Sequence, residues 1–235
     1  MTEFPDKRDL KNQIIEIVVD CLSIGRKLPS EKELVERLGV SRSGLRELLV
    51  GFEESGIIVA TKGKGREVKL PDISNSISGG WNILLRARPE SLLELLNVRY
   101  VLERGFLPVA IESLTLEDLE IMRDLVSRMI AKAKRNDVFT EEDHKFHRIL
   151  YSRIDNLILD QLLSAFWNLL EETSELQRSD DLIQGAELHQ DLFQAILIQD
   201  YEEAERMLEM QFTDVRSRLK VYVENQLRAS LREET

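Results

Sequence analysis

Hydrophobic positions near the N-terminus repeat at the spacing of an α-helix. Leu10, Ile14 and Val18 are four residues apart, with Ile17 beside them, and this pattern predicts a first helix that ends near Gly25. Side chains that recur at this interval share one face of a helix. We therefore expect this face to pack against the elements that follow it in the chain.

Two further short helices are expected after the first. The Ser-x-x-Glu pattern that starts at Ser30 matches a capping box and predicts a helix over about residues 31–38, which Gly39 ends. Ser41 can cap a third helix that runs to Gly56. Its expected buried face consists of Leu45, Leu48, Leu49 and Phe52. Because the intervening turn is very short, the pair is predicted to be a helix-turn-helix, whose second helix enters the major groove of DNA.

Apolar and polar residues alternate after the third helix. Residues 57–60 and 66–70 have the pattern of two short strands, and the glycine-rich turn 62–65 joins them, which predicts a β-hairpin. A hairpin in this place is the wing of a winged helix-turn-helix domain, expected over residues 1–72. The polar, turn-rich stretch that follows predicts a linker over residues 73–89.

Residues 90–235 show no strand pattern and are expected to form an all-α effector-binding and dimerisation domain. Thr115 with Asp118, and Thr140 with Asp143, have capping-box spacing. Amphipathic stretches that predict helices lie near residues 90–112, 115–135, 139–153, 156–178, 180–198 and 200–230. The predicted fold class is mainly α, with an N-terminal winged helix-turn-helix, a small β-hairpin wing and a C-terminal antiparallel helical bundle.

Composition favours a cytoplasmic protein that has no membrane partner. The chain has 235 residues, of which 43% are hydrophobic, enough for a core in each of two domains. No apolar run approaches the about 20 residues that span a bilayer, and the first residues are too polar for a signal peptide. The single cysteine, Cys21, excludes an internal disulfide and is expected to be a small buried apolar residue.

The acidic net charge is confined to the C-terminal part of the chain. The total is −11, yet residues 1–72 carry 13 basic and 13 acidic side chains. Within that part, residues 61–69 hold four cations and one anion. Such a basic segment at the predicted wing is suited to contact with phosphate, and the acidic domain is expected to face away from DNA.

The third helix is predicted to read DNA. It begins at Ser41, and Arg42, Ser43, Gly44 and Arg46 are expected on its exposed first turns. Arginine can bond a guanine with two hydrogen bonds, serine can donate to a base or phosphate, and glycine lets a helix approach the DNA backbone. The alternative is a structural three-helix unit with ordinary surface arginines, which the following wing disfavours.

The N-terminal motifs resemble the GntR family of bacterial regulators over about residues 9–70. The resemblance is carried by Leu28-Pro29-Ser30-Glu31, Leu38-Gly39-Val40-Ser41-Arg42, Leu45-Arg46-Glu47 and Gly56-Ile57-Ile58. It implies DNA-contacting positions at Lys32 and at the recognition-helix residues named above, and minor-groove contact by Gly63 at the wing tip. Lys62 and Lys64 beside it are expected to contact DNA too. The resemblance also implies a homodimer on a short palindromic operator of double-stranded DNA.

Three residues of the C-terminal domain have the chemistry of a metal site. Asp143 and His147 are four residues apart, so they share a face of one predicted helix, and His189 is expected to point inward from a later helix. A carboxylate and imidazoles that converge in a bundle core suit a divalent transition metal with open positions for a ligand. Taken alone, the pattern is also typical of a structural hydrogen bond. His144 is expected to face solvent.

The C-terminal domain resembles the all-helical FCD effector domain of the FadR subfamily over about residues 90–220. The resemblance is carried by Glu94, Arg99 and Glu103, Asp143-x-x-Phe146-His147 and Glu187-x-His189. It implies a metal such as zinc, nickel or manganese on one aspartate and three histidines. Asp143, His147 and His189 match three of these positions, whereas Gln211 stands at the fourth. Glutamine is a poor zinc ligand, so the site is either weakened, altered in selectivity, or metal-free with a hydrogen-bonding role.

Arg99 is the candidate for binding the effector, because a fixed guanidinium can clamp a carboxylate with two hydrogen bonds. The resemblance implies this role, while a salt bridge to Glu103 one turn later is equally consistent with the sequence. Asn156 is expected to cap its helix first and to contact an effector second.

These features predict a dimeric, DNA-binding transcription repressor whose operator affinity is controlled by a small effector, expected to be a carboxylate metabolite. One alternative is a metal-independent regulator of a larger apolar ligand such as an acyl-CoA. A second is an enzyme with a hydrolytic metal on Asp143, His147 and His189, which would leave the DNA-reading half without a purpose. A plain interaction scaffold explains neither half.

Overall fold

The computed structural model describes residues 7–25, 27–61, 65–171 and 181–233. The chain divides into two compact units, residues 1–76 and 77–235, which we call unit 1 and unit 2. Each unit has its own hydrophobic core.

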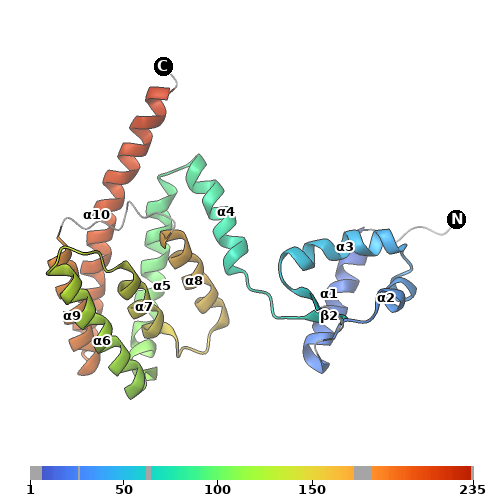
Figure 1. Ribbon diagram of the computed structural model, residues 1–235, viewed down its shortest axis with the longest axis horizontal. Helices are drawn as coiled ribbons and strands as arrows, with labels where there is room; N and C mark the ends of the chain where they lie inside the picture. Colours follow the sequence, from blue (N-terminus) through green and yellow to red (C-terminus); the bar gives the residue numbers. More distant parts are fainter. Residues whose placement is uncertain (1–6, 26, 62–64, 172–180, 234–235) are drawn as a thin grey trace. The chain divides into compact units, whose positions relative to one another are not determined.

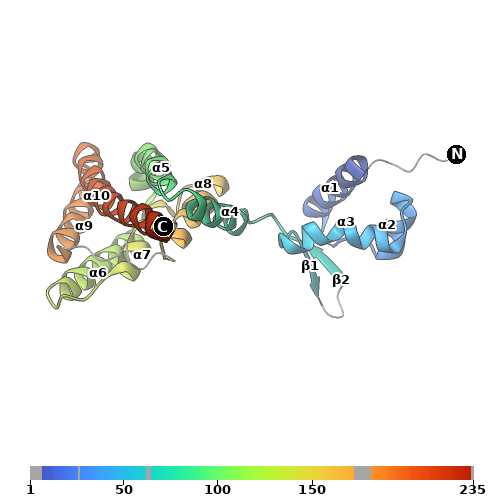
Figure 2. The ribbon, with the colours of Figure 1, turned by 90° about the horizontal axis from the view of Figure 1, so that it is seen from above.

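Unit 1 is a three-helix domain with a small antiparallel sheet (Figure 1). In the sheet, Ile58 is paired with Val68 and Thr61 with Gly65. Figure 2 shows the hairpin extending away from the three helices of the unit. The elements are α1 (Lys7–Ile24), α2 (Glu31–Leu38), α3 (Arg42–Glu54), β1 (Ile58–Thr61) and β2 (Gly65–Val68). The winged helix-turn-helix predicted from the sequence is therefore confirmed.

Local signals set the helix ends of unit 1. Ser30 and Glu33 form the complete capping box of α2, and Gly39 ends this helix in the left-handed conformation, at φ 64°. Ser41 caps α3 by accepting a hydrogen bond from the backbone N–H of Gly44 at 3.1 Å. Because these contacts fix where α2 stops and α3 starts, they also fix the tight turn between the two helices.

Unit 2 is the predicted bundle of helices (Figure 1). Its core is formed by α5, α6, α7, α8, α9 and α10, which pack side by side around Phe146, Leu150 and Trp167. Of the helices in the described parts of the chain, none is both long and apolar enough to cross a membrane. The helices are α4 (Ser74–Ala87), α5 (Ser91–Ser113), α6 (Leu116–Ala133), α7 (Thr140–Tyr151), α8 (Leu157–Glu171), α9 (Leu182–Leu197) and α10 (Tyr201–Glu233).

The linker predicted over residues 73–89 is wrong as a description of their structure, because they contain the helix α4. Asp72 caps the start of this helix by accepting from the backbone N–H of Ser74 at 2.9 Å. Trp81 then packs on Phe166 of α8, with ring centroids 4.6 Å apart. Packing of Trp81 on the buried Phe166 offsets the poor helix propensity of the two glycines before Trp81.

Three further local predictions have different outcomes. Thr115 and Asp118 form the predicted capping box of α6. Thr140 does not cap α7, since this helix begins at Thr140 itself, after Phe139, with no side-chain cap. Cys21 is half-buried rather than fully buried, and its thiol donates to the carbonyl oxygen of Lys27 at 3.3 Å.

Replacing Asp118 by alanine should lower the free energy of unfolding by about 1–2 kcal/mol at neutral pH, the usual cost of losing an N-cap partner. The carboxylate accepts from the backbone of Thr115 at 2.9 Å and from Arg153 Nε at 2.9 Å. Arg153 is the main cause that lowers the pKa of Asp118 to about 2.

A group with a lowered folded-state pKa stabilises the fold above its unfolded pKa of about 4. The stability difference between the parent and Asp118→Ala should therefore be full above about pH 4 and shrink as the pH falls toward 2. Urea unfolding followed by circular dichroism at several pH values measures it. A difference that is the same at pH 7 and pH 2.5 would contradict the role of the ionised carboxylate.

Candidate functional site

The recognition helix α3 presents the polar residues that the sequence predicts for DNA contact. Ser41, Arg42, Ser43 and Arg46 are exposed and Gly44 is half-buried. The hydroxyl of Ser41 serves the helix cap and also lies 3.0 Å from the hydroxyl of Ser43. Arg42 and Arg46 are thus the long cationic side chains on the first turns of this helix.

Lys32 on α2 is also exposed, with its Nζ 4.0 Å from Glu36 Oε1. Three predicted DNA contacts, Lys62, Gly63 and Lys64, lie outside the described residues. The strands β1 and β2 that lead to this turn are in place.

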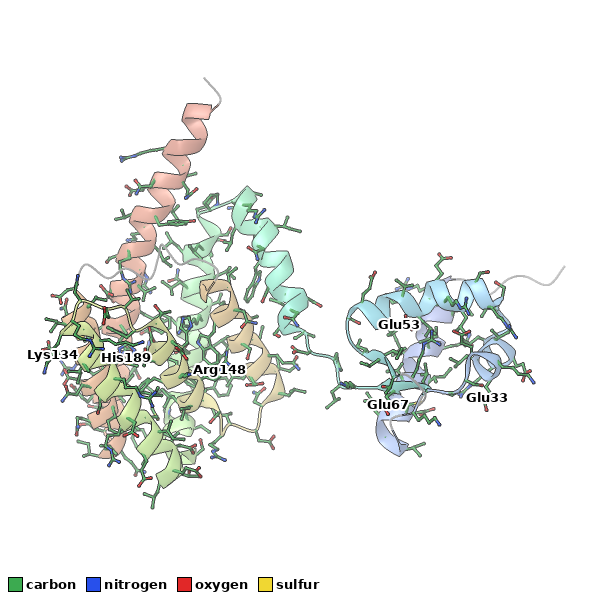
Figure 3. All side chains as sticks on the ribbon, viewed as in Figure 1. Glu33, Glu53, Glu67, Lys134, Arg148 and His189 are labelled. Carbon is green, nitrogen blue, oxygen red and sulfur yellow. The ribbon has the colours of Figure 1, made fainter. Side chains whose placement is uncertain are left out.

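A second candidate site lies inside unit 2. A cavity of about 120 Å³ opens between α5, α7, α9 and α10. Figure 3 labels His189, which lies among these helices. The residues that line the cavity are Leu96, Arg99, Phe139, Thr140, Asp143, His144, His147, Leu182, Gly185, Leu188, His189, Gln211, Phe212, Asp214, Val215, Arg218 and Leu219.

The three predicted metal ligands meet on one wall of this cavity. Asp143, His147 and His189 each offer a donor atom, and these atoms all lie within 4.8 Å of one another. Asp143 Oδ1 is 3.1 Å from His189 Nε2 and 3.3 Å from His147 Nε2. The side chains of His147 and His189 are 5% and 7% exposed, while that of Asp143 is 36% exposed. The cluster is therefore reached through its carboxylate.

The outer nitrogen of each imidazole faces an acceptor. His189 Nδ1 lies 2.8 Å from the carbonyl oxygen of Gly185, which holds the ring with Nε2 toward Asp143. His147 Nδ1 lies 3.3 Å from the fully buried Glu103 Oε2, off the direction of a good hydrogen bond. Such outer acceptors orient metal-binding histidines. One carboxylate and two imidazoles, of which that of His189 is held by its outer acceptor, fit a divalent transition metal.

The charge of Asp143 favours a bound cation at this cluster. Burial raises the pKa of Asp143, but the neighbouring His189 and His147 lower it by more, so the carboxyl pKa is well below its ordinary value. Burial lowers the pKa of His189, and Asp143 raises it by more. The carboxylate is thus ionised at neutral pH, and a metal would compete with a proton for His189, so metal affinity should fall as the pH falls.

Gln211 on α10 lines the same cavity and is only 8% exposed. Among the described residues, neither its Oε1 nor its Nε2 has a hydrogen-bond partner. A buried amide without partners is costly unless a ligand completes it. Gln211 therefore offers one donor and one acceptor to whatever fills the cavity.

Arg99 makes the predicted salt bridge with Glu103, at 2.5 Å between Nε and Oε1. Its side chain is 10% exposed, lines the cavity, and lies with its guanidinium carbon 5.2 Å from the ring centroid of Phe212. Arg99 can thus pair with Glu103 and also face an effector in the cavity, which are the two roles that the sequence left open. Asn156 caps α8 by accepting from the N–H of Leu159 at 3.0 Å, and it does not line the cavity.

Sequence reasoning misplaced one residue of the site and missed two. His144 lines the cavity and is half-buried, so the expectation that it faces solvent is wrong. Asp214 and Arg218 also line the cavity and pair with each other at 3.0 Å. The spacing of Gln211, Asp214 and Arg218 by three and seven residues places them on one face of α10, a signal that could have revealed them.

Comparison with known proteins agrees with both halves of the chain. Residues 7–68 match the family of bacterial regulatory proteins called gntR, and residues 94–213 match the FCD domain. The HTH-type transcriptional regulator LutR of Bacillus subtilis is 29% identical over 210 residues, which cover 86% of this chain and 95% of LutR. The Glc operon transcriptional activator of Escherichia coli is 30% identical over 163 residues, covering 66% of this chain and 62% of the relative.

Among solved structures, a GntR protein of Streptococcus agalactiae superposes with a TM-score of 0.67 and 20% identity. The superposition covers 90% of this chain and 99% of that protein, which supports the fold of both units. The matched families and these relatives are regulators rather than enzymes, so the hydrolase alternative is excluded. The chain belongs to the GntR family of bacterial regulatory proteins, in the group whose C-terminal part is an FCD effector domain, and it is a DNA-binding regulator of transcription.

Proposed function

We propose that this protein is a cytoplasmic repressor that binds a palindromic operator as a homodimer and responds to a small carboxylate held beside a divalent metal. The observation that carries the proposal is the convergence of Asp143, His147 and His189 on the cavity that Arg99 also lines. Zinc, nickel and manganese all accept this donor set. The open positions of the metal and the guanidinium together suit an anionic ligand with oxygen donors.

The size of the cavity favours a small effector over an acyl-CoA. Its volume is about 120 Å³. A cavity of about 150 Å³ is filled by a molecule of the size of benzene. A carboxylate of a few carbon atoms therefore fits inside the cavity, whereas most of the dozens of heavy atoms of an acyl-CoA would have to lie outside it. Gln211 adds a second polar contact, because its unpartnered amide can donate to a carboxylate oxygen.

An apolar stripe on α5 supports the homodimer. Val98, Val101 and Val109 are 52%, 66% and 51% exposed, and Gly105 lies on the same face of the helix. Exposed apolar stripes of this kind commonly mark protein interfaces, and a glycine lets two helices approach closely. Two copies joined there would carry two recognition helices, as a palindromic operator requires.

A ligand in the cavity would contact four helices at once. The walls of the cavity come from these helices, including the long α10, so a ligand that binds one arrangement of them more tightly biases the whole bundle toward it. We infer that this bias changes the spacing of the two recognition helices and so the affinity for DNA.

Metal content tests the proposal first. Protein purified without a histidine tag is examined by metal mass spectrometry beside an Asp143→Ala, His147→Ala double variant. About one metal ion per chain in the parent, lost in the variant, is the expected result. Thermal unfolding with a panel of small carboxylates then identifies those that stabilise the parent but not the variant. Absence of metal from both proteins would contradict the metal-dependent part of the proposal.

The direction of regulation is tested separately, because one relative is named as an activator. A promoter reporter that carries DNA selected by the protein should be silenced when the protein is expressed, and a stabilising carboxylate should restore expression. Higher expression with the protein than without it would contradict repression.

A further inference from the structure

A carboxylate lies within the arginine surface of unit 1. Glu31, the first residue of α2, faces Arg46 on α3, with Nη2 to Oε2 at 3.3 Å and Nε to Oε1 at 3.5 Å. Arg66 on β2 binds the same carboxylate at 2.9 Å and also binds Glu53 at 2.7 Å. One ionic network therefore joins the first turn of α2, the recognition helix and the wing strand.

The side chains of this network differ in their exposure to solvent. The side chains of Arg66 and Glu31 are 25% and 28% exposed, whereas that of Arg46 is 66% exposed. Arg66 and Arg46, in this order, lower the pKa of Glu31, so that it stays ionised at neutral pH. The half-buried Glu31, paired with Arg66, is thus an anion toward which the exposed guanidinium of Arg46 is turned.

Such an anion has two effects on an arginine that contacts DNA. It orders a long, flexible side chain before DNA arrives, so that less rotamer entropy is lost when Arg46 bonds a base. It also cancels part of the positive charge, which weakens attraction to phosphates of any sequence. The first effect raises the ratio of sequence-specific to non-specific binding, whereas the second lowers the affinity for DNA of any sequence.

We propose that Glu31 is a positioning residue for operator reading, which holds Arg46 in its reading orientation and repels non-specific phosphate contacts. This inference rests on the proposed function of unit 1 as an operator reader. In this arrangement an anionic residue, rather than a further cation, contributes to the discrimination between DNA sequences.

The test compares Glu31→Gln with the parent on two DNA probes. One is a duplex selected by the parent from a randomised pool, and the other is a random-sequence duplex of equal length. Affinities are measured by fluorescence anisotropy over a range of NaCl concentrations. In the variant, random DNA should bind more tightly, and the slope of log K against log salt should steepen by up to about 0.9. The ratio of selected to random affinity should fall by about 5-fold or more, the range of one lost bidentate base contact.

Glu36→Gln is the matched control, because it removes the same charge from the same helix. Glu36 is 67% exposed and its carboxylate lies 4.0 Å from Lys32. We expect its selected-to-random ratio to equal that of the parent. An equal fall of the ratio in both variants would overturn the inference, since net charge alone would then explain the effect.

Arg46→Ala separates positioning from a purely structural role. If Glu31 acts through Arg46, adding Glu31→Gln to Arg46→Ala should leave the ratio unchanged, whereas independent effects would multiply and overturn the inference. A Glu31→Gln variant that keeps the parental ratio would also overturn the inference, while the proposed function of unit 1 would stand. A parent chain that selects no sequence from the pool would overturn the proposed function itself, and the inference with it.

Discussion

A His189→Ala variant should bind zinc or manganese far more weakly than the parent. Loss of a residue that only orients a metal ligand typically lowers metal affinity about 10- to 100-fold, and removal of a ligand should exceed this. His189 is buried, its Nε2 lies 3.1 Å from Asp143 Oδ1, and it is the residue that α9 contributes to the three-residue cluster. Competition titration with a fluorescent chelator measures the affinity, and the response to a stabilising carboxylate should disappear with it.

Two other substitutions test whether this loss of metal affinity is specific to the three-residue cluster. His144→Ala removes an imidazole that lines the cavity but lies outside the three-residue cluster, and it should retain the parental metal affinity. Gln211→His replaces the unpartnered amide by a nitrogen donor and should bind metal at least as tightly as the parent. Equal weakening in His144→Ala and His189→Ala would mean that the metal does not sit on the cluster.

An Arg42→Ala variant should lose about 1–3 kcal/mol of operator binding, which is about 5- to 150-fold in affinity, if Arg42 contacts a base edge. Arg42 is the first residue of α3, directly after the Ser41 cap, and its side chain is exposed. Selection of DNA from a randomised pool by the variant should also show relaxed preference at one base pair of each half-site. Fluorescence anisotropy on the DNA selected by the parent measures the loss.

Arg123→Ala on α6 removes the same charge from unit 2 and serves as the control. Its affinity for the selected DNA should be that of the parent. If Arg42→Ala weakens selected and random DNA to the same extent, Arg42 contacts phosphate only, and its predicted role in base reading is wrong.

The sequence by itself determined the elements other than α4 and the chemical types of residue in the two candidate sites. The capping residues Ser30, Ser41 and Thr115 lie within three residues of the backbone groups that they satisfy, so their roles follow from local sequence. The spacing of Asp143 and His147 likewise fixes a shared helix face without knowledge of the rest of the chain.

Only the tertiary structure decided which distant residues meet and how much space they enclose. Glu31 and Arg66 are 35 residues apart, and Asp143 and His189 are 46 apart, so no local period could pair them. Packing likewise accompanies a helix in the predicted linker, where the half-buried Trp81 lies against Phe166. It also placed the Gln211 amide in a cavity of about 120 Å³, where no other described residue forms a hydrogen bond with it. The physical reason is that caps and helical faces depend on neighbours within a turn or two, whereas ion pairs and cavities depend on how whole helices pack.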